Sequence, residues 1–289
     1  MKKSLIALAV LAASGAAFAQ SSVSISGGVR IGYGDVGGVK GLSTNQGSGN
    51  TMNFNIVEDL GGGLKAMAST QFRWDSTSGK NANSTEDLFH LASVGLSGAF
   101  GTVQAGRIGL NGQWGYNAFG STTAGVASSA DQARGGATED GQLRYTSPNI
   151  SGFSVELAQT DKGAGARKGS QVRASYANGP VSVSYIKEEL TAAGADTTSI
   201  GASYNLGFAT LMVVNADNEA AGKATTFGAR VPMGAVTFKA QQRNGKDAVA
   251  DVTAFGVDYA LSKRTVVEVN NWKADGGTTN TWFGVRHSY

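Results

Sequence analysis

The chain has 289 residues, of which 41% are hydrophobic and 16% are charged, with 42 glycines and three prolines. It contains no cysteine, which excludes a disulfide framework, and its formal net charge of +3 does not point to a nucleic-acid partner. The apolar residues are plentiful and alternate with polar ones, which argues against a disordered chain.

The first residues have the pattern of a secretory signal peptide. Lys2 and Lys3 are followed by an apolar run and by a small-x-small cleavage signal that ends at Ala19. We expect residues 1–19 to be removed and residues 20–289 to form one domain. Without the two lysines, the 24 basic residues become 22 against 21 acidic ones, so the net charge of the mature chain is only +1.

The chain that follows alternates with the period of two that a half-buried strand needs. In the first segment one face carries Val23, Ile25, Val29, Ile31 and Tyr33, while polar residues and glycine occupy the other. The same period recurs along the chain in runs that helical spacing fits poorly. The apolar faces of these runs are Met52-Phe54-Ile56, Leu64-Ala66-Ala68-Thr70-Phe72-Trp74, Phe153-Val155-Leu157, Val172-Ala174-Tyr176, Val181-Val183-Tyr185, Ile200-Ala202-Tyr204, Val236-Phe238-Ala240 and Phe255-Val257-Tyr259. Residues 208–215 are ambiguous, because 211–214 are continuously apolar.

The connections between these runs alternate between short and long. Short turns fall at 60–63, 97–100, 148–151, 178–179, 206–207, 232–234 and 261–264, and longer polar loops at 34–49, 75–87, 109–140, 161–167, 188–196, 217–222, 244–250 and 274–280. Seven short turns and eight longer loops predict sixteen antiparallel strands. No mature segment has the ~20 apolar residues of a spanning helix. We therefore predict an all-β fold, a transmembrane antiparallel β-barrel with short turns at one end.

One insert is far longer than the other connections. It separates GTVQAGR at 101–107 from QLRYTS at 142–147. A long loop inside a compact domain is usually functional. We interpret it as a constriction loop that folds into the barrel and narrows it.

If the apolar face meets lipid, the opposite face lines the lumen. Basic residues expected there are Arg30, Lys65, Arg73, Arg144, Arg173, Arg230, Lys239, Arg243 and Arg286, and acidic ones are Glu156, Asp258 and Glu268. Nine basic against three acidic side chains predict a cationic lumen whose field acts on passing solutes. Their alternative role is to keep the lumen hydrated and to pair with loop carboxylates.

Several charged residues lie at or on the long loop. Arg107 falls on the outward-facing positions of its strand, but a β-bulge where the long loop begins would turn it toward the lumen. Asp131, Glu139 and Asp140 either face the arginines across the pore or pair with the barrel wall and pin the loop. We leave these two readings open.

Four stretches resemble trimeric general diffusion porins of the beta-proteobacterial Gram-negative porin family. They are VEDLGGGLKA at 57–66, SVGLSGAFGTVQAGR at 93–107, RYTSPNISGFSVE at 144–156 and LSKRT at 261–265. The resemblance implies a trimer in the outer membrane. The last residues resemble the family's aromatic-ended final strand, with Phe283, Val285 and Tyr289 outward as the signal for barrel-assembly machinery.

The chain departs from the family pattern near the expected constriction. Arg30 stands where the family often has an acidic residue, and Thr51 where it usually has an arginine. The loop motif is Asn117, Ala118, Phe119 and Gly120 in place of a Pro-Glu-Phe-Gly-like sequence, so the loop glutamate is missing.

The function expected from these features is passive diffusion of small hydrophilic solutes and ions, with moderate anion selectivity. The alternatives are a substrate-selective channel and a non-conducting barrel adhesin or scaffold. Enzymatic activity is not expected, because His90 and His287 belong to no recognisable catalytic arrangement and no metal-ligand or cofactor motif is present. Trp74, Trp272 and Tyr33 lie near strand ends and are expected in the aromatic belts at the membrane interfaces.

Overall fold

The computed structural model describes residues 21–44, 50–82, 88–109, 112–120, 138–161, 168–190 and 196–289. The expected signal peptide and Asp131 lie outside these ranges, and Glu139 lies in a strand whose pairing alone is described. Within the described residues, no helix is long and apolar enough to cross a membrane.

The described chain is almost entirely β-strand, as the alternation predicts. The strands are β1 (Ser22–Val36), β2 (Val39–Ser43), β3 (Asn50–Gly61), β4 (Leu64–Trp74), β5 (Leu91–Gly98), β6 (Gly101–Gly109), β7 (Thr138–Thr146), β8 (Phe153–Thr160), β9 (Gly169–Asn178), β10 (Val181–Leu190), β11 (Thr197–Asn205), β12 (Thr210–Asn218), β13 (Gly222–Met233), β14 (Val236–Gly245), β15 (Val252–Ala260), β16 (Thr265–Ala274) and β17 (Thr279–Ser288). A short 3-10 helix, η1 (Trp114–Tyr116), lies between β6 and β7. All strand pairings are antiparallel and join one sheet.

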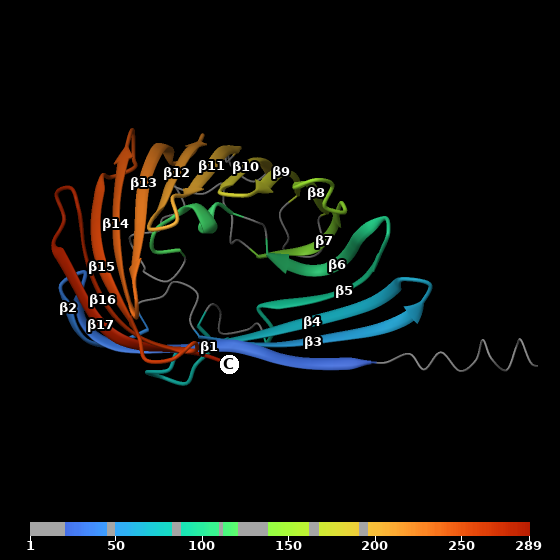
Figure 1. Ribbon diagram of the computed structural model, residues 1–289, viewed down its shortest axis with the longest axis horizontal. Coiled ribbons are helices and arrows are strands. Elements are labelled where there is room, and N and C mark those ends of the chain that lie inside the picture. Colours follow the sequence, from blue (N-terminus) through green and yellow to red (C-terminus); the bar gives the residue numbers. More distant parts are fainter. Residues whose placement is uncertain are drawn as a thin grey trace, which may run out of the picture.

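The sheet closes on itself through β1. The first half of β1 pairs with β3, from Ser22 opposite Val57, and its second half pairs with β17, from Gly28 opposite Ser288. β2 folds back on the end of β1 as a hairpin, so sixteen strands circle the barrel and the predicted number is confirmed. Figure 1 shows the strands surrounding an interior in which η1 lies.

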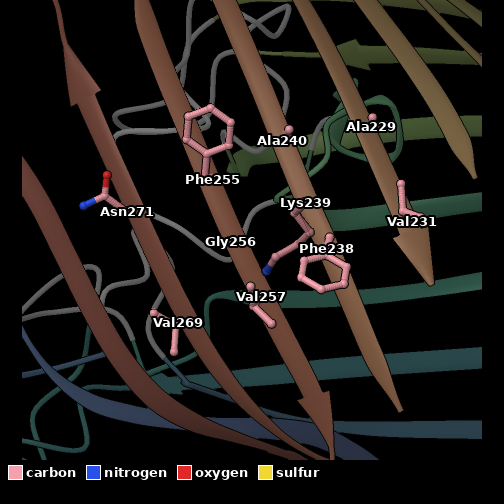
Figure 2. Close-up of a pocket in the computed structure, with 10 residues that line it drawn as sticks. All are labelled: Ala229, Val231, Phe238, Lys239, Ala240, Phe255, Gly256, Val257, Val269 and Asn271. Atoms are coloured by element: carbon pink, nitrogen blue, oxygen red, sulfur yellow. The ribbon is translucent and has the colours of Figure 1, made fainter. Parts of the chain in front are cut away.

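The barrel is apolar outside and polar inside. On β14 and β15, Phe238 and Phe255 are exposed on the outer surface, while Lys239 and Gly256 are buried on the inner one. Figure 2 shows this alternation, with the phenylalanine rings on the outer face of neighbouring strands. Outward apolar and inward polar side chains in strict alternation are the pattern of a barrel in lipid.

The two ends of the barrel differ in their connections. Seven turns of two to six residues join β3 to β4, β5 to β6 and so on to β15–β16 at one end. β6 ends and β7 begins at the other end, where the long loop connects them. The expected contrast fails at two connections of that end, because three residues join β12 to β13 and four join β16 to β17. These hairpins are tight because the strands themselves extend further than the sequence suggested.

The inner face is not uniformly polar. In the segment that was ambiguous in sequence, Met212 and Val214 of β12 point inward and are buried, while Leu211 is exposed outside. β12 contacts η1. Apolar side chains therefore occur on both faces of β12, with the inward ones buried on the side of η1 and the outward ones on the outer surface. Trp272 and Trp282 are also buried on the inner side, so the expected place of Trp272 in an interface belt is wrong.

Candidate functional site: a loop seated on the inner wall

The segment from Gln113 to Gly120 lies inside the barrel against its wall (Figure 1). Gln113, Asn117, Ala118 and Phe119 are each at most 1% exposed, so the motif at 117–120 faces protein on most sides. The prediction that the long loop enters the lumen is therefore confirmed. The residues that place the loop are found on strands far away in the sequence.

The start of this segment is held by polar contacts to β10 and β11. The side-chain amide of Gln113 donates to Ser184 O at 3.1 Å and to Ser199 Oγ at 3.2 Å. The hydroxyl of Tyr116 lies 2.9 Å from Ser182 Oγ. Buried polar groups need such partners because leaving them unpaired costs about 1–3 kcal/mol each.

The end of the segment is held by β13 and β14. Arg230 donates from Nε to Ala118 O at 2.7 Å and from Nη2 to Asn117 O at 3.1 Å. Gln241 accepts from the Ala118 backbone N–H at 3.0 Å. Arg230 was expected to present a charge to the pore, and two of its donors are instead used to hold the loop backbone.

The Phe119 ring fills an apolar pocket of the wall. It belongs to a buried cluster with Ala118, Val252, Ala254, Trp272 and Trp282. The ammonium of Lys239 lies 4.9 Å from the ring centroid, within range of a cation–π interaction. Lys239 also pairs with Asp258 at 2.5 Å, so this cation has both a ring and a carboxylate beside it.

Of the two arginines expected near the loop mouth, Arg107 lies near the end of β6 where the loop begins, whereas Arg144 lies further along β7, opposite Gln104. Arg144 is buried, donates to Gly109 O and to Gln142 Oε1, and lies 3.5 Å from Glu156 Oε1. Because Gly109 is the last residue of β6, Arg144 fixes the point where the loop leaves the wall.

Arg107 forms an ion pair with Asp140 and donates from Nε to His90 O at 3.1 Å. The β6–β7 register does shift between Gly106 and Ile108. Arg107 nevertheless pairs across β5 with Ala92, on the same face as the 62% exposed Val94. The bulge thus occurs without turning this position to the inner face. Asp140 lies in β7 and not in the loop, so its pair with Arg107 joins two neighbouring strands of the wall.

Arg30 lies on the inner side but does not meet open solution, since it is 1% exposed. Its Nε and Nη2 donate to Glu268 Oε2 at 2.9 and 2.6 Å, and its guanidinium lies 4.1 Å from the centroid of the Trp282 ring. Arg286 donates to the other oxygen, Glu268 Oε1, at 2.6 Å. The buried carboxylate of Glu268 thus partly neutralises both Arg30 and Arg286, which were expected to be lumen cations.

Arg73 has a different environment. It is partly exposed on the inner face of β4 and donates from Nε to Gln71 Oε1 at 2.6 Å. Gln71 in turn donates to Asn53 Oδ1 at 2.6 Å. Within the described part of the chain Arg73 has no carboxylate partner, so its charge is balanced only by amide dipoles there.

A cavity of about 620 Å³ lies beside the seated loop. It is bordered by Trp114 and Phe119 of the loop and by Arg230, Lys239, Asp258 and Arg286 of the wall. Charged groups of both signs therefore meet the space next to the loop.

Three functional features were missed in the sequence. Glu188 is buried on the inner face of β10 and accepts a hydrogen bond from Gln171 Nε2 at 3.2 Å. Its inward position could have been predicted, because Glu188 and Ser184 are four residues apart and therefore share one face of the strand. Gln113 and Gln241 carry no signal of their own, because a glutamine that holds a distant loop looks like any other polar inward residue.

The last strand closes the ring. Phe283 and Val285 are exposed on the outer surface, as the parity predicts. Tyr289 exchanges backbone hydrogen bonds with Gly27 at 3.1 Å, and its hydroxyl donates to Thr51 O at 3.0 Å.

Comparison with known proteins gives concordant results. The family model described as Gram-negative porin matches residues 5–274. Outer membrane porin protein 32 of Delftia acidovorans is 33% identical over 93% of this chain and 88% of its own length. The solved structure of the anion-selective porin from Comamonas acidovorans has a TM-score of 0.75 at 24% identity, covering 93% of this chain and 100% of that one. A mutant of Rh. blastica porin has a TM-score of 0.74 at 18% identity with the same coverage of both chains.

Proposed function

Because the chain belongs to the family of Gram-negative porins, as its motifs predicted, we propose that it is an outer-membrane channel for passive diffusion of small hydrophilic solutes and ions. The observation that carries this function is a closed barrel that is apolar outside, polar inside and narrowed by a loop seated on one wall. Barrels of sixteen to eighteen strands are wide enough to leave an aqueous passage. The channel needs no cofactor and catalyses no reaction.

The passage prefers anions. Basic side chains outnumber acidic ones on the inner face even when Glu188 is added to the acids, and Ala118 occupies the place of the family's loop glutamate. A low-dielectric wall focuses the field of such charges on the solution it encloses. The solved relative from Comamonas acidovorans is itself named an anion-selective porin, which supports the sign. The preference is moderate, because ion pairs such as Lys239 with Asp258 cancel part of the charge.

Purified protein in planar bilayers tests both statements. Ion-conducting steps test the channel, and the reversal potential in a potassium chloride gradient tests the selectivity. We expect chloride to be preferred, increasingly so as salt is lowered, because the screening length grows from about 8 Å at physiological ionic strength to about 30 Å at 0.01 M. Absence of conducting steps contradicts the channel, and a potassium preference contradicts only the selectivity.

Three statements about biogenesis complete the proposal. Residues 1–19 direct export and are removed, leaving 20–289 as one barrel domain. The outward Phe283 and Val285, with the terminal Tyr289, are the strand read by barrel-assembly machinery. The barrels associate as homotrimers. A monodisperse monomer in native mass spectrometry of the membrane-extracted protein would contradict the trimer.

A further inference from the structure

The loop rests on glycines of the wall. Three inner-face glycines lie beneath it on alternate strands: Gly201 on β11, Gly228 on β13 and Gly256 on β15. Each faces a different loop side chain, Tyr116, Ala118 and Phe119 respectively. We refer to these three glycines as the glycine seat.

A Cβ atom at any of these positions would come closer to the loop than ordinary van der Waals contact. At Gly256 it would lie 2.5 Å from Asn270 Oδ1 of the wall and 2.8 Å from Phe119 Cε1 of the loop, and at Gly228 3.1 Å from the Cβ and backbone N of Ala118. At Gly201 it would lie 2.8 Å from Gln113 Oε1 and closer still to the Tyr116 ring. Real Cβ atoms essentially never approach within 3.0 Å of another heavy atom, so at two of these positions the loop or the wall would have to move.

The backbone does not require glycine at these positions. The glycines with positive φ lie elsewhere, mostly in the turns, and the glycine seat is in ordinary extended strand. Glycine inside a strand is destabilising by roughly 0.5–1 kcal/mol relative to alanine and often marks a close approach of another backbone. Glycine is therefore explained at these positions by the space that the loop occupies, and not by a backbone conformation that only glycine can adopt.

We propose that Gly201, Gly228 and Gly256 are positioning residues that set how far the constriction loop stands out from the wall, and hence the width of the passage. The loop cannot simply turn away from an added side chain, because Arg230 and Gln241 hold its backbone on either side of Ala118. A methyl group under the loop therefore moves it toward the pore axis. The inference rests on the proposed channel function.

The most direct test combines a substitution of Gly201 with one of Tyr116, whose ring lies above it. Gly201→Ala should lower single-channel conductance by roughly a third, because the loop moves into the passage by a fraction of its width. Tyr116→Ala combined with Gly201→Ala should restore most of the loss, since the smaller side chain leaves room for the methyl group. Gly28→Ala is the matched control, because Gly28 also faces inward on β1 but its Cβ would meet nothing closer than 3.4 Å.

Each outcome has a defined meaning. Unchanged or raised conductance in Gly201→Ala, an equal loss in Gly28→Ala, or no recovery in the double variant overturns the proposal. If the wild-type protein itself forms no conducting pore, the proposed function fails instead. If Gly201→Ala does not insert into the membrane, Gly228→Ala replaces it.

Gly228→Ala gives an independent test, because a Cβ there would lie 3.1 Å from Ala118 Cβ. This separation is shorter than ordinary van der Waals contact but not below 3.0 Å, so the loss of conductance should have the same sign as in Gly201→Ala and a smaller size. Unchanged or raised conductance in Gly228→Ala, with Gly28→Ala behaving as wild type, overturns the proposal.

Discussion

At the scale of single residues, inward position and free charge are different properties. Arg30, Glu268 and Arg286 all face inward, yet they form an ion-pair network between β1, β16 and β17 in which Arg30 and Glu268 are buried and Arg286 is partly exposed. Two charges in such a pair attract each other strongly, but both have lost their hydration. The arginines therefore contribute less field to the passage than their number suggests, and more to the closure of the barrel.

Removing the shared carboxylate should destabilise the barrel. In Glu268→Gln, Arg30 keeps its buried position without a counter-charge, and breaking one partner of a buried pair typically costs about 3–5 kcal/mol. We expect a lower temperature for the loss of the compact band in semi-native electrophoresis. Asp217→Asn is the control, because Asp217 pairs with Lys223 on the exposed surface and should leave that temperature unchanged. Equal behaviour of both variants would contradict the structural role of Glu268.

The pH response should depend on His90, which lies between β4 and β5. Burial, with the nearby Arg73 and Arg107, lowers the pKa of His90 to about 3. In the unfolded chain a histidine has a pKa of about 6.5, so between these values only the unfolded state binds the proton. The stability associated with neutral His90 is full above pH 6.5 and falls as pH falls toward 3. Lowering pH from 7.5 to 5.5 should therefore reduce the unfolding temperature less in His90→Gln than in wild type. An identical decrease in both would show that His90 titrates normally.

At the scale of elements, the wall has two different halves. The described contacts of residues 113–120 go to strands from β10 to β17, whose inner face supplies glycines, glutamines and buried aromatic rings. The strands β3 and β4 instead carry amide and hydroxyl pairs, such as Gln71 with Asn53 and Ser69 with Asn55. The described part of the loop makes no contact with β3 or β4, and Arg230 is engaged with the loop backbone, which makes Arg73 a better candidate for contact with ions than Arg230.

Arg73 on β4 and Arg144 on β7 should respond differently to substitution. Arg73→Gln removes a charge that has no described carboxylate partner and should reduce the chloride preference roughly twofold, with little change in conductance. Arg144→Gln frees Gly109 O at the base of the loop and should change the conductance as well. Reversal potentials and single-channel currents from the same bilayers separate the two effects. If both variants change selectivity alone, Arg144 does not position the loop.

At the scale of the whole molecule, closure depends on the last residue. Tyr289 contributes two backbone hydrogen bonds to β1 and one side-chain hydrogen bond to β3. An unclosed sheet would leave backbone groups unpaired in lipid, where each costs several kcal/mol. The terminal strand therefore closes the hydrogen-bonded sheet and also carries the proposed assembly signal.

Deleting Tyr289 should strongly reduce the amount of protein in the outer membrane, measured by fractionation. Tyr289→Phe keeps the aromatic ring and the backbone pairing but loses the hydrogen bond to Thr51, so it should insert nearly as wild type does. Normal insertion of the deletion variant would contradict the role of the terminal residue. Failure of Tyr289→Phe would assign that role to the hydroxyl group.

The sequence by itself determined the barrel, its sixteen strands, the outward faces and the presence of a long inward loop. These follow from local chemistry, because a period of two and the spacing of turns are written along a single stretch of chain. Only the tertiary structure decided which inward charges are free. Arg30 meets Glu268 across 238 positions and Ala118 meets Gln241 across 123, and no local pattern encodes such pairs. The glycine seat has the same origin, because a glycine in a strand shows its purpose only when the loop above it is in place.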